Sequence, residues 1–555
     1  LAARFDGNLV RVIAVVAVIA CSFLYVVAQI YGVGLITSRI TGVAFEIGVF
    51  LGLGGILVCS FLGGMRAVTW TQVAQCIVVL VAFLVPVSWL SLKQHAGPVP
   101  QVTYGQQLRK VVRAEQRIAA DPAEQRVIEV YRARAVADDA RLADIPSALA
   151  TLRAAALGRI AELKARNAPQ GDIQAAERAL AAVPRDADEA RSMWTRDRDD
   201  NLGHARPLAG MPPHVQQFEG NPAGDATQVQ AFDESRRNFL ALVFCLMLGT
   251  ASLPHVLTRF YTSSSVAETR ASVGWSLFFI ALLYVSAPAL AVLVKLEVFT
   301  HLVGTPFDQL PAWIGNWARV DGSLLQVDDV NRDGILQLGE LHIGGDILVL
   351  ATPEIGGLPY AVSGLVAAGG MAAALSTADG LLLTIANALS HDLWFRIVDP
   401  QARGTQRVTV SKVLLLMVAL AAAYATAQKP GDILQLVSAA FSLAASALFP
   451  ALVLGVFWRR ANRWGAAAGM TAGFGVTLYY VLANQPGFRE TMGILGPRHL
   501  WWNIQPIAAG VFGVPIGFAT MAVVSLLTPP PSAAAMAMVD AIRLPERGTR
   551  SSNGP

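Results

Sequence analysis

The sequence contains few charged residues. Asp, Glu, Lys and Arg make up 15% of the 555 residues, whereas hydrophobic residues make up 54%. Apolar runs long enough to cross a bilayer recur along most of the chain, which a large soluble core would not need. The formal net charge is only +4, which is too small to indicate a nucleic-acid partner. The composition therefore favours an all-α polytopic membrane protein.

Cysteine is equally scarce, and each of the four cysteines lies inside an apolar run. They are Cys21, Cys59, Cys76 and Cys245. We interpret them as small buried hydrophobic side chains, because their positions do not resemble a disulfide framework or a zinc site.

Several functional motifs are also missing. The sequence has no glycine-rich nucleotide-binding loop, no kinase or ATPase signature, and no filter loop or ring of charges. We therefore predict no catalytic residue and no enzyme activity. A cleavable signal peptide is not visible, and the chain starts abruptly at Leu1, so we expect that an N-terminal portion precedes it.

The apolar runs predict about ten transmembrane helices. They are expected at 12–34, 43–62, 68–90, 238–258, 273–295, 356–390, 409–427, 432–457, 465–483 and 505–527. Three spans fall in residues 1–92 and seven in residues 237–527. Residues 93–236 are charged and have apolar residues at helical spacing, which predicts a soluble helical insert, with disorder as the competing interpretation. Residues 528–555 are expected to be a disordered tail.

Basic residues of the short loops gather on one side of this topology. They are Arg4, Arg11, Arg66, Arg259, Arg270, Arg396, Arg403, Arg407, Lys412, Arg459, Arg460 and Arg463, followed by the arginines of the tail. The positive-inside rule then places both ends in the cytoplasm. The insert and the loop at 299–353 would face outward across a bacterial inner membrane.

A polar cluster lies in the middle of the span at 356–390. Ala373, Ser376 and Thr377 share one helix face, and Asp379 follows them. Hydroxyl and carbonyl oxygens form a hard site of the kind that suits Na⁺. Alternatively, Ser376 and Thr377 bond back to their own helix or join two helices. Asp379 is a candidate coupling group, since a carboxylate inside a membrane is costly unless it has a function.

The span at 238–258 contains a predicted break in the sequence Gly-Thr-Ala-Ser-Leu-Pro-His at 249–255. Proline, glycine and two hydroxyls disrupt the helical hydrogen bonds, and broken helices line the solute cavities of secondary transporters. We therefore predict Thr250, Ser252 and Pro254 as cavity residues. A proline kink without a ligand is the competing interpretation.

The outward loop contains the pattern of a twelve-residue calcium loop, D-x-N-x-D-G-x5-E. The candidate Ca²⁺ ligands are Asp329, Asn331, Asp333, Ile335 through its carbonyl, and Glu340. An ordinary turn rich in Asp, Asn and Gly is the alternative. A calcium ion here would have a structural role.

Three segments resemble the solute:sodium symporter family, most closely its acetate-permease-like branch of bacterial monocarboxylate symporters. They are GGMRAVTWTQVAQ at 63–75, GTASLPHVLTRFYT at 249–262 and MAAALSTADGLLLTIANALSHDL at 371–393. The resemblance implies a five-plus-five inverted-repeat core with a central solute and sodium-driven alternating access. On this map the first two core helices are absent. The long insert and the calcium-like loop resemble a subgroup that often has a small two-span membrane subunit.

The resemblance also implies roles for single residues. Ala373, Ser376 and Thr377 fall on the family's sodium-binding positions in the eighth core helix. Thr250 stands where proline-transporting members have an aromatic residue, which fits a smaller solute such as a short carboxylate. Gln72 replaces an Asp that helps some members to bind a second sodium, so we expect one coupling ion unless Asp379 serves.

The sequence thus predicts a sodium-coupled symporter that imports a small monocarboxylate such as acetate, in contact with the lipid bilayer and without a nucleic-acid partner. Two alternatives remain. One is a sodium symporter for another small solute, such as an amino acid or another organic acid. The other is a membrane sensor or scaffold with a vestigial transport core.

Overall fold

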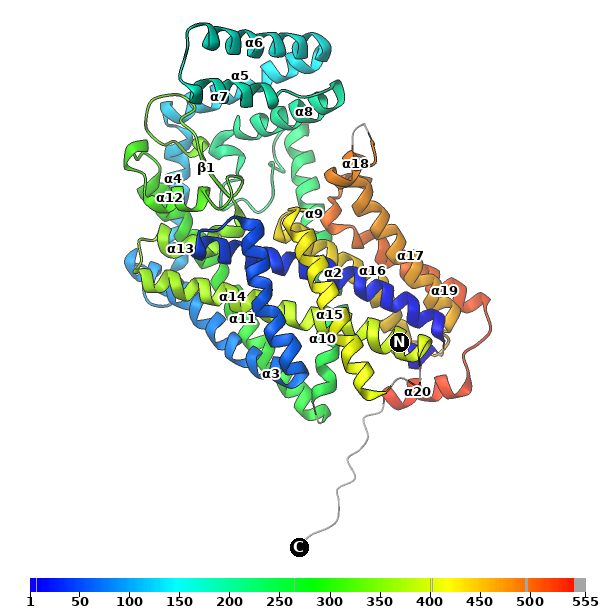
Figure 1. The fold of residues 1–555 in the computed structure, drawn as a ribbon. Coiled ribbons are helices and arrows are strands. Elements are labelled where there is room, and N and C mark those ends of the chain that lie inside the picture. Colours follow the sequence, from blue (N-terminus) through cyan, green and yellow to red (C-terminus); the bar gives the residue numbers. More distant parts are fainter. Residues whose placement is uncertain (6, 264, 400, 402, 495–497, 544–555) are drawn as a thin grey trace.

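The computed structural model describes residues 1–5, 7–263, 265–399, 401, 403–494 and 498–543. Long apolar helices form a bundle, and a group of polar helices rises above it (Figure 1). The bundle helices are α2 (Asn8–Thr41), α3 (Phe45–Lys93), α9 (Ala226–Ser252), α10 (Pro254–Leu257), α11 (Val266–Glu297), α14 (Tyr360–Asn387), α15 (Gly404–Ala427), α16 (Ile433–Phe457), α17 (Arg463–Asn484) and α19 (Gly510–Leu527). The all-helical polytopic class is therefore confirmed.

Fewer than the ten predicted spans can be counted within the described residues. Eight helices of the described chain are long and apolar enough to cross a membrane, or nine if the bent pair of α9 and α10–η2 counts as one span. The span predicted at 43–62 accounts for the difference. Its described apolar part, Phe45–Val58, is too short to qualify alone.

The spans predicted at 43–62 and 68–90 are joined in α3 without a break in the helical backbone. A straight helix of 49 residues would be roughly 74 Å long. Both ends of α3 nevertheless lie near one short segment. Arg39, in the last turn of α2 and six residues before α3 begins, pairs with Glu354, while Lys93 at the end of α3 donates to the carbonyl oxygen of Gly356 at 2.7 Å. The helix therefore turns back, and its arms run in different directions in Figure 1.

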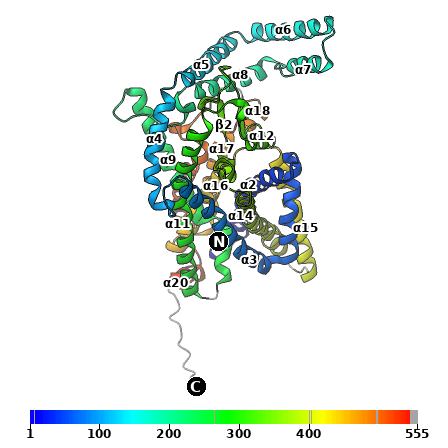
Figure 2. The same cartoon turned by 90° about the vertical axis from the view of Figure 1, so that its left-hand side faces the viewer.

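Five helices form the polar group above the bundle. They are α4 (Pro100–Ala119), α5 (Pro122–Ala143), α6 (Ile145–Ala165), α7 (Gln170–Ala181) and α8 (Ala187–His204). Proline at the first or second position starts α4, α5 and α6, where a missing N–H has no cost. Asp121 and Asp144 cap α5 and α6 through backbone N–H groups. In Figure 2, α6 and α7 extend furthest from the bundle.

The segment between α11 and α14 packs against both the bundle and the polar helices. It contains η3 (Val298–Leu302), α12 (Ala312–Ala318), a two-stranded antiparallel sheet and α13 (Gly345–Ile355). The sheet pairs β1 (Leu325–Val327) with β2 (Leu341–Ile343). Trp317 and Leu336 are buried in the same hydrophobic core as α2, so this segment is an integral part of the fold.

The tail is partly ordered. Residues 533–543 form α20 (Ala533–Arg543), and Asp540 pairs with Arg459. The prediction of a disordered tail is wrong for this helix, because its buried Ala535 and Val539 make one apolar face that the Pro-rich composition concealed. The rest of that prediction, residues 544–555, lies outside the described residues.

Candidate sodium and solute site

The three residues predicted to bind sodium lie on the middle of α14. The hydroxyls of Ser376 and Thr377 both donate to the carbonyl oxygen of Ala373, over 3.1 and 3.2 Å. Ala373 is exposed, and the two hydroxyl residues are half-buried. This is the back-bonding that the alternative interpretation expects. However, each hydroxyl oxygen keeps its lone pairs, so three neutral oxygens that fit a hard cation are gathered at one place.

Gln72 connects this part of α14 to α3. Its side-chain amide donates to the carbonyl oxygen of Ser376 at 2.7 Å. Two turns earlier along α14, α14 and α3 approach so closely that a Cβ on Gly369 would lie 2.2 Å from Cβ of Ala82. Small residues permit such an approach between membrane helices. The backbone beside the oxygen cluster is therefore held by a polar contact and by close packing.

Asp379 is fully buried, one helical turn from the oxygen cluster. Arg259 interacts with it electrostatically. The guanidinium Nη2 of Arg259 lies 3.2 Å from the position a Cβ would take on Gly380, and the amide nitrogen of Gln72 lies 3.9 Å from the same position. Residues from three separate helical segments, η2 (Thr258–Thr262), α3 and α14, thus form a polar cluster in which Asp379 is buried and Arg259 and Gln72 are half-buried.

Sequence reasoning assigned Arg259 only to a basic loop. The sequence does place it four residues after His255, on the same helical face. No local pattern pairs that face with α14, so the cluster with Asp379 could not be found from the sequence.

The helix break predicted at 249–255 is present between α9 and α10. Leu253 is extended, with φ −62° and ψ 123°, and the two helices differ in direction by 40°. A residue before proline is driven away from helical geometry, and proline supplies no N–H, so α9 ends at Ser252. Thr250 is exposed, whereas Ser252 and Pro254 are buried. Among the described contacts, no hydrogen bond joins Thr250 or Ser252 to Ser376 or Thr377.

Aromatic rings that the sequence did not single out surround this break. Tyr25 of α2 contacts the rings of His255 and Phe441, with 5.6 Å between centroids in both pairs. A Cβ on Gly249 would lie 2.7 Å from Cβ of Phe441, so α9 and α16 are in close contact here. Aromatic side chains therefore pack against one side of the break between α9 and α10.

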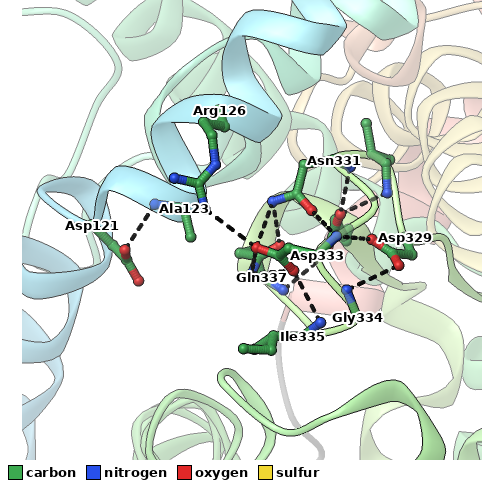
Figure 3. A network of polar contacts seen from close by, with 11 residues as sticks. Asp121, Ala123, Arg126, Asp329, Asn331, Asp333, Gly334, Ile335 and Gln337 are labelled. Carbon is green, nitrogen blue, oxygen red and sulfur yellow. Dashed lines mark hydrogen bonds and ion pairs between the residues drawn. The ribbon is translucent and has the colours of Figure 1, made fainter.

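The loop at 299–353 folds around its own acidic side chains (Figure 3). Asp329 accepts from the backbone N–H groups of Asp333 and Gly334, both at 3.1 Å. Glu340 accepts from the backbone N–H groups of residues 330, 331 and 337. In the described part of the chain, no group of three or more His, Cys, Asp or Glu side chains is arranged to hold a metal ion.

The same loop docks against α5 of the polar helices. Arg126 reaches Asp333 at 3.5 Å, as Figure 3 shows, and Glu124 accepts from the N–H of Gly339 at 3.0 Å. Burial is the main reason that the pKa of Glu124 rises to about 6, and the nearby charge of Glu340 adds to it. Sequence reasoning treated the loop as a metal site and missed this contact between distant segments.

A broken span inside a polytopic helical bundle is typical of secondary transporters. The sodium:solute symporter family profile matches residues 1–114 and 355–473. An uncharacterised symporter of Cupriavidus necator is 54% identical over 536 residues, which are 95% of this chain and 77% of that protein. The chain belongs to the sodium:solute symporter family, and it is a transporter and not an enzyme.

Two more distant similarities complete the comparison. A monocarboxylic acid transporter of Corynebacterium glutamicum is 26% identical over 283 residues, 51% of this chain and 45% of its own length. The solved structure of a Na⁺-coupled sialic acid symporter, in a substrate-bound outward-open state, superposes with a TM-score of 0.50 at 14% identity. It covers 96% of this chain and 77% of that chain, and it supports the fold alone.

Proposed function

We propose that this symporter couples the inward movement of Na⁺ to the import of a small monocarboxylate such as acetate. The oxygen cluster of Ala373, Ser376 and Thr377 is the observation that carries the sodium part of the proposal. It offers a carbonyl and two hydroxyls at one place on α14. Sodium bound there would be held by neutral oxygens, beside the amide of Gln72.

The proposal of a small carboxylate has two supports. Thr250, at the helix break, is compact and polar and leaves room that a larger aromatic residue would fill. The monocarboxylic acid transporter is a relative over half of this chain, although a distant one. We propose that Thr250, Ser252 and Pro254 line the solute cavity and that Asp379 contributes to coupling.

The arrangement in the membrane is part of the same proposal. Residues 1–92 and 237–527 would form the transport core, with 93–236 as an outward-facing insert. Basic loops then place both ends of the chain in the cytoplasm. Protease accessibility of the insert in right-side-out membrane vesicles tests this orientation.

Calcium binding by the outward loop remains a prediction. The oxygens of Asp329, Asn331, Asp333 and Glu340 would have to exchange their present donors for the ion. Titration of the purified protein with Ca²⁺, followed by thermal unfolding, decides the question. No stabilisation by saturating Ca²⁺ would remove the loop from the list of metal sites and leave its contact with α5 as its role.

Uptake by proteoliposomes tests the transport proposal. With an inward sodium gradient we expect labelled acetate to accumulate, and accumulation to stop when the gradient is dissipated. Sodium-driven accumulation of an amino acid or another organic acid, without acetate, would show that only the solute is wrong. If no solute accumulates but ligands still bind, the sensor or scaffold interpretation replaces the proposal.

A further inference from the structure

A small cavity with a basic lining lies where the N-terminal segment, the start of α17 and the segment before α20 meet. Its volume is about 220 Å³. The first helix, α1 (Ala2–Phe5), contributes Arg4, and α17 contributes Arg463. The opposite wall is the proline segment 529–531. In Figure 1, α20 and the N-terminus lie near each other at the same end of the bundle.

Arg4 is the unusual residue of this cavity. Only 7% of it is exposed. Its Nε donates to the carbonyl oxygen of Gly455 at 2.7 Å, and its Nη2 donates to that of Trp458 at 3.2 Å. Its Nη1 is buried and has no hydrogen-bond partner in the described part of the chain. A buried charged donor without an acceptor is costly, and it commonly indicates an ion or water that belongs there.

Arg463 adds a second guanidinium to the same lining. It stacks on Trp464, with 5.2 Å from Cζ to the ring centroid, and it is exposed. It is also the first residue of α17, a helix of 22 residues whose N-terminal end favours negative charge. None of the described lining residues is acidic. The lining therefore carries positive charge that it does not neutralise itself.

The far wall of the cavity is fixed by hydrogen bonds. The side-chain amide of Asn462 donates to the carbonyl oxygen of Pro529 at 2.8 Å and to the hydroxyl of Thr528 at 2.7 Å. The nearby acidic residue Asp540 is engaged by Arg459. Hydrogen bonds thus hold this wall of the cavity in place, and no carboxylate of the described tail residues lines it.

We propose that this cavity binds a phosphate-type oxyanion, held by the guanidinium groups of Arg4 and Arg463 and by the N-terminal end of α17. Guanidinium groups bind phosphate oxygens with paired, charge-assisted hydrogen bonds. The anion is the headgroup of an anionic phospholipid or free phosphate. A lipid headgroup is within reach because the cavity lies at the ends of membrane spans, where basic pockets bind such groups.

The test uses the purified protein and thermal unfolding in two arms. One arm titrates inorganic phosphate against chloride at equal ionic strength, so that general screening is the same. The other compares nanodiscs of pure phosphatidylcholine with nanodiscs that contain phosphatidylglycerol. Stabilisation by phosphate identifies the free anion, and stabilisation only by phosphatidylglycerol identifies the lipid.

Variants assign the effect to the cavity. Arg4→Gln and Arg463→Gln should each weaken the apparent affinity at least about tenfold, as expected for the loss of a charge-assisted contact. Arg459→Gln is the matched control, because it removes a neighbouring arginine that pairs with Asp540, and it should leave the affinity unchanged.

Arg4→Gln also removes two bonds to backbone carbonyls and could fail to fold. Arg463 makes no hydrogen bond or ion pair to described residues, so Arg463→Gln gives the clear result. The proposal is overturned if neither phosphate nor phosphatidylglycerol stabilises the protein. It is equally overturned if the stabilisation is the same in Arg463→Gln as in the unchanged protein.

Discussion

The region around α14 and the pair α16–α17 both pack through small and hydroxyl-bearing residues, but only the first contains buried charge. Between α17 and α16, a Cβ on Gly473 would lie 2.3 Å from the carbonyl oxygen of Ser446. The hydroxyl of Thr477 donates to that of Ser446 at 2.7 Å, which in turn donates to the carbonyl oxygen of Ser442 at 2.8 Å. Both hydroxyls donate a hydrogen bond, so the two helices are held together closely.

The region around α14 uses similar residues differently. Ser376 and Thr377 leave lone pairs on a partly open helix face, and Asp379 and Arg259 bring ionisable groups into the bundle. A neighbouring span is broken at Leu253, so its backbone is not a continuous helix. Hydroxyls that pack among glycines thus hold helices together by hydrogen bonds. Hydroxyls beside a buried charge and an interrupted helix are instead open to a ligand.

Removing the buried carboxylate should have the largest effect on this comparison. Asp379→Asn leaves Arg259 without the charge of that carboxylate, and breaking a buried charge interaction costs about 3–5 kcal/mol of unfolding free energy. Arg259→Gln should have a similar cost. Denaturation of both single variants and of the double variant forms a double-mutant cycle, in which we expect the double variant to lose less than the sum.

Arg270→Gln is the control for this cycle, since Arg270 is an exposed arginine on the following helix, α11. Additive effects of Asp379→Asn and Arg259→Gln would mean that the two groups do not stabilise each other. The region around α14 would then not be distinguished by a stabilising interaction between buried and half-buried charges.

The second prediction concerns the oxygen cluster itself. Ser376→Ala combined with Thr377→Ala removes two of its three oxygens. Contacts of polar groups with a charge are worth about 1.5–3 kcal/mol each, so the apparent affinity for Na⁺ should fall at least about a hundredfold. The measurement is the sodium dependence of thermal unfolding, with choline as the replacement cation.

Ser446→Ala provides the matched loss of a hydroxyl in the other region. It should lower the melting temperature slightly and leave the sodium affinity unchanged. If Ser446→Ala weakens sodium binding as much as the α14 variant, the effect is general destabilisation, and the proposed sodium site is wrong.

The third prediction tests the close packing around Gly473 of α17. In Gly473→Ala the new methyl group would meet the backbone carbonyl oxygen of Ser446, which no side-chain rotation can relieve. Overpacking of this kind costs about 1–3 kcal/mol. Gly475→Ala on the same helix has open space and should be neutral. Equal melting temperatures for the two variants would contradict the close packing of α17 against α16.

Local patterns in the sequence predicted much of this molecule. The long apolar runs predicted the polytopic class, Pro254 predicted the end of α9, and the shared face of Ala373, Ser376 and Thr377 predicted their proximity. Each of these features is set within one helix, where spacing determines geometry. The sodium, solute and calcium roles of these residues stay predictions.

Contacts between distant segments could not be predicted in the same way. Arg259 and Asp379 are 120 positions apart in the sequence, and Arg4 and Gly455 are separated by 451. Nothing in a local pattern chooses such partners. The order of α20 was also missed, because its apolar face is only visible once its packing against the bundle is known.

The smallest expected effect comes from the junction between α5 and the loop at 299–353. Burial raises the pKa of Glu124 from 4.5 to about 6, so the folded protein binds this proton more tightly than the unfolded chain. The free energy of unfolding should therefore fall as the pH rises from about 4.5 to about 6, by up to about 2 kcal/mol.

Glu124→Gln keeps an acceptor for the N–H of Gly339 but cannot ionise, so its stability should depend less on pH in this range. Glu129→Gln, an exposed change on the same helix, should follow the unchanged protein. Melting temperatures of the three proteins at several pH values make the comparison. Parallel curves for all three would show that Glu124 carries no charge penalty and that the docked loop is insensitive to this proton.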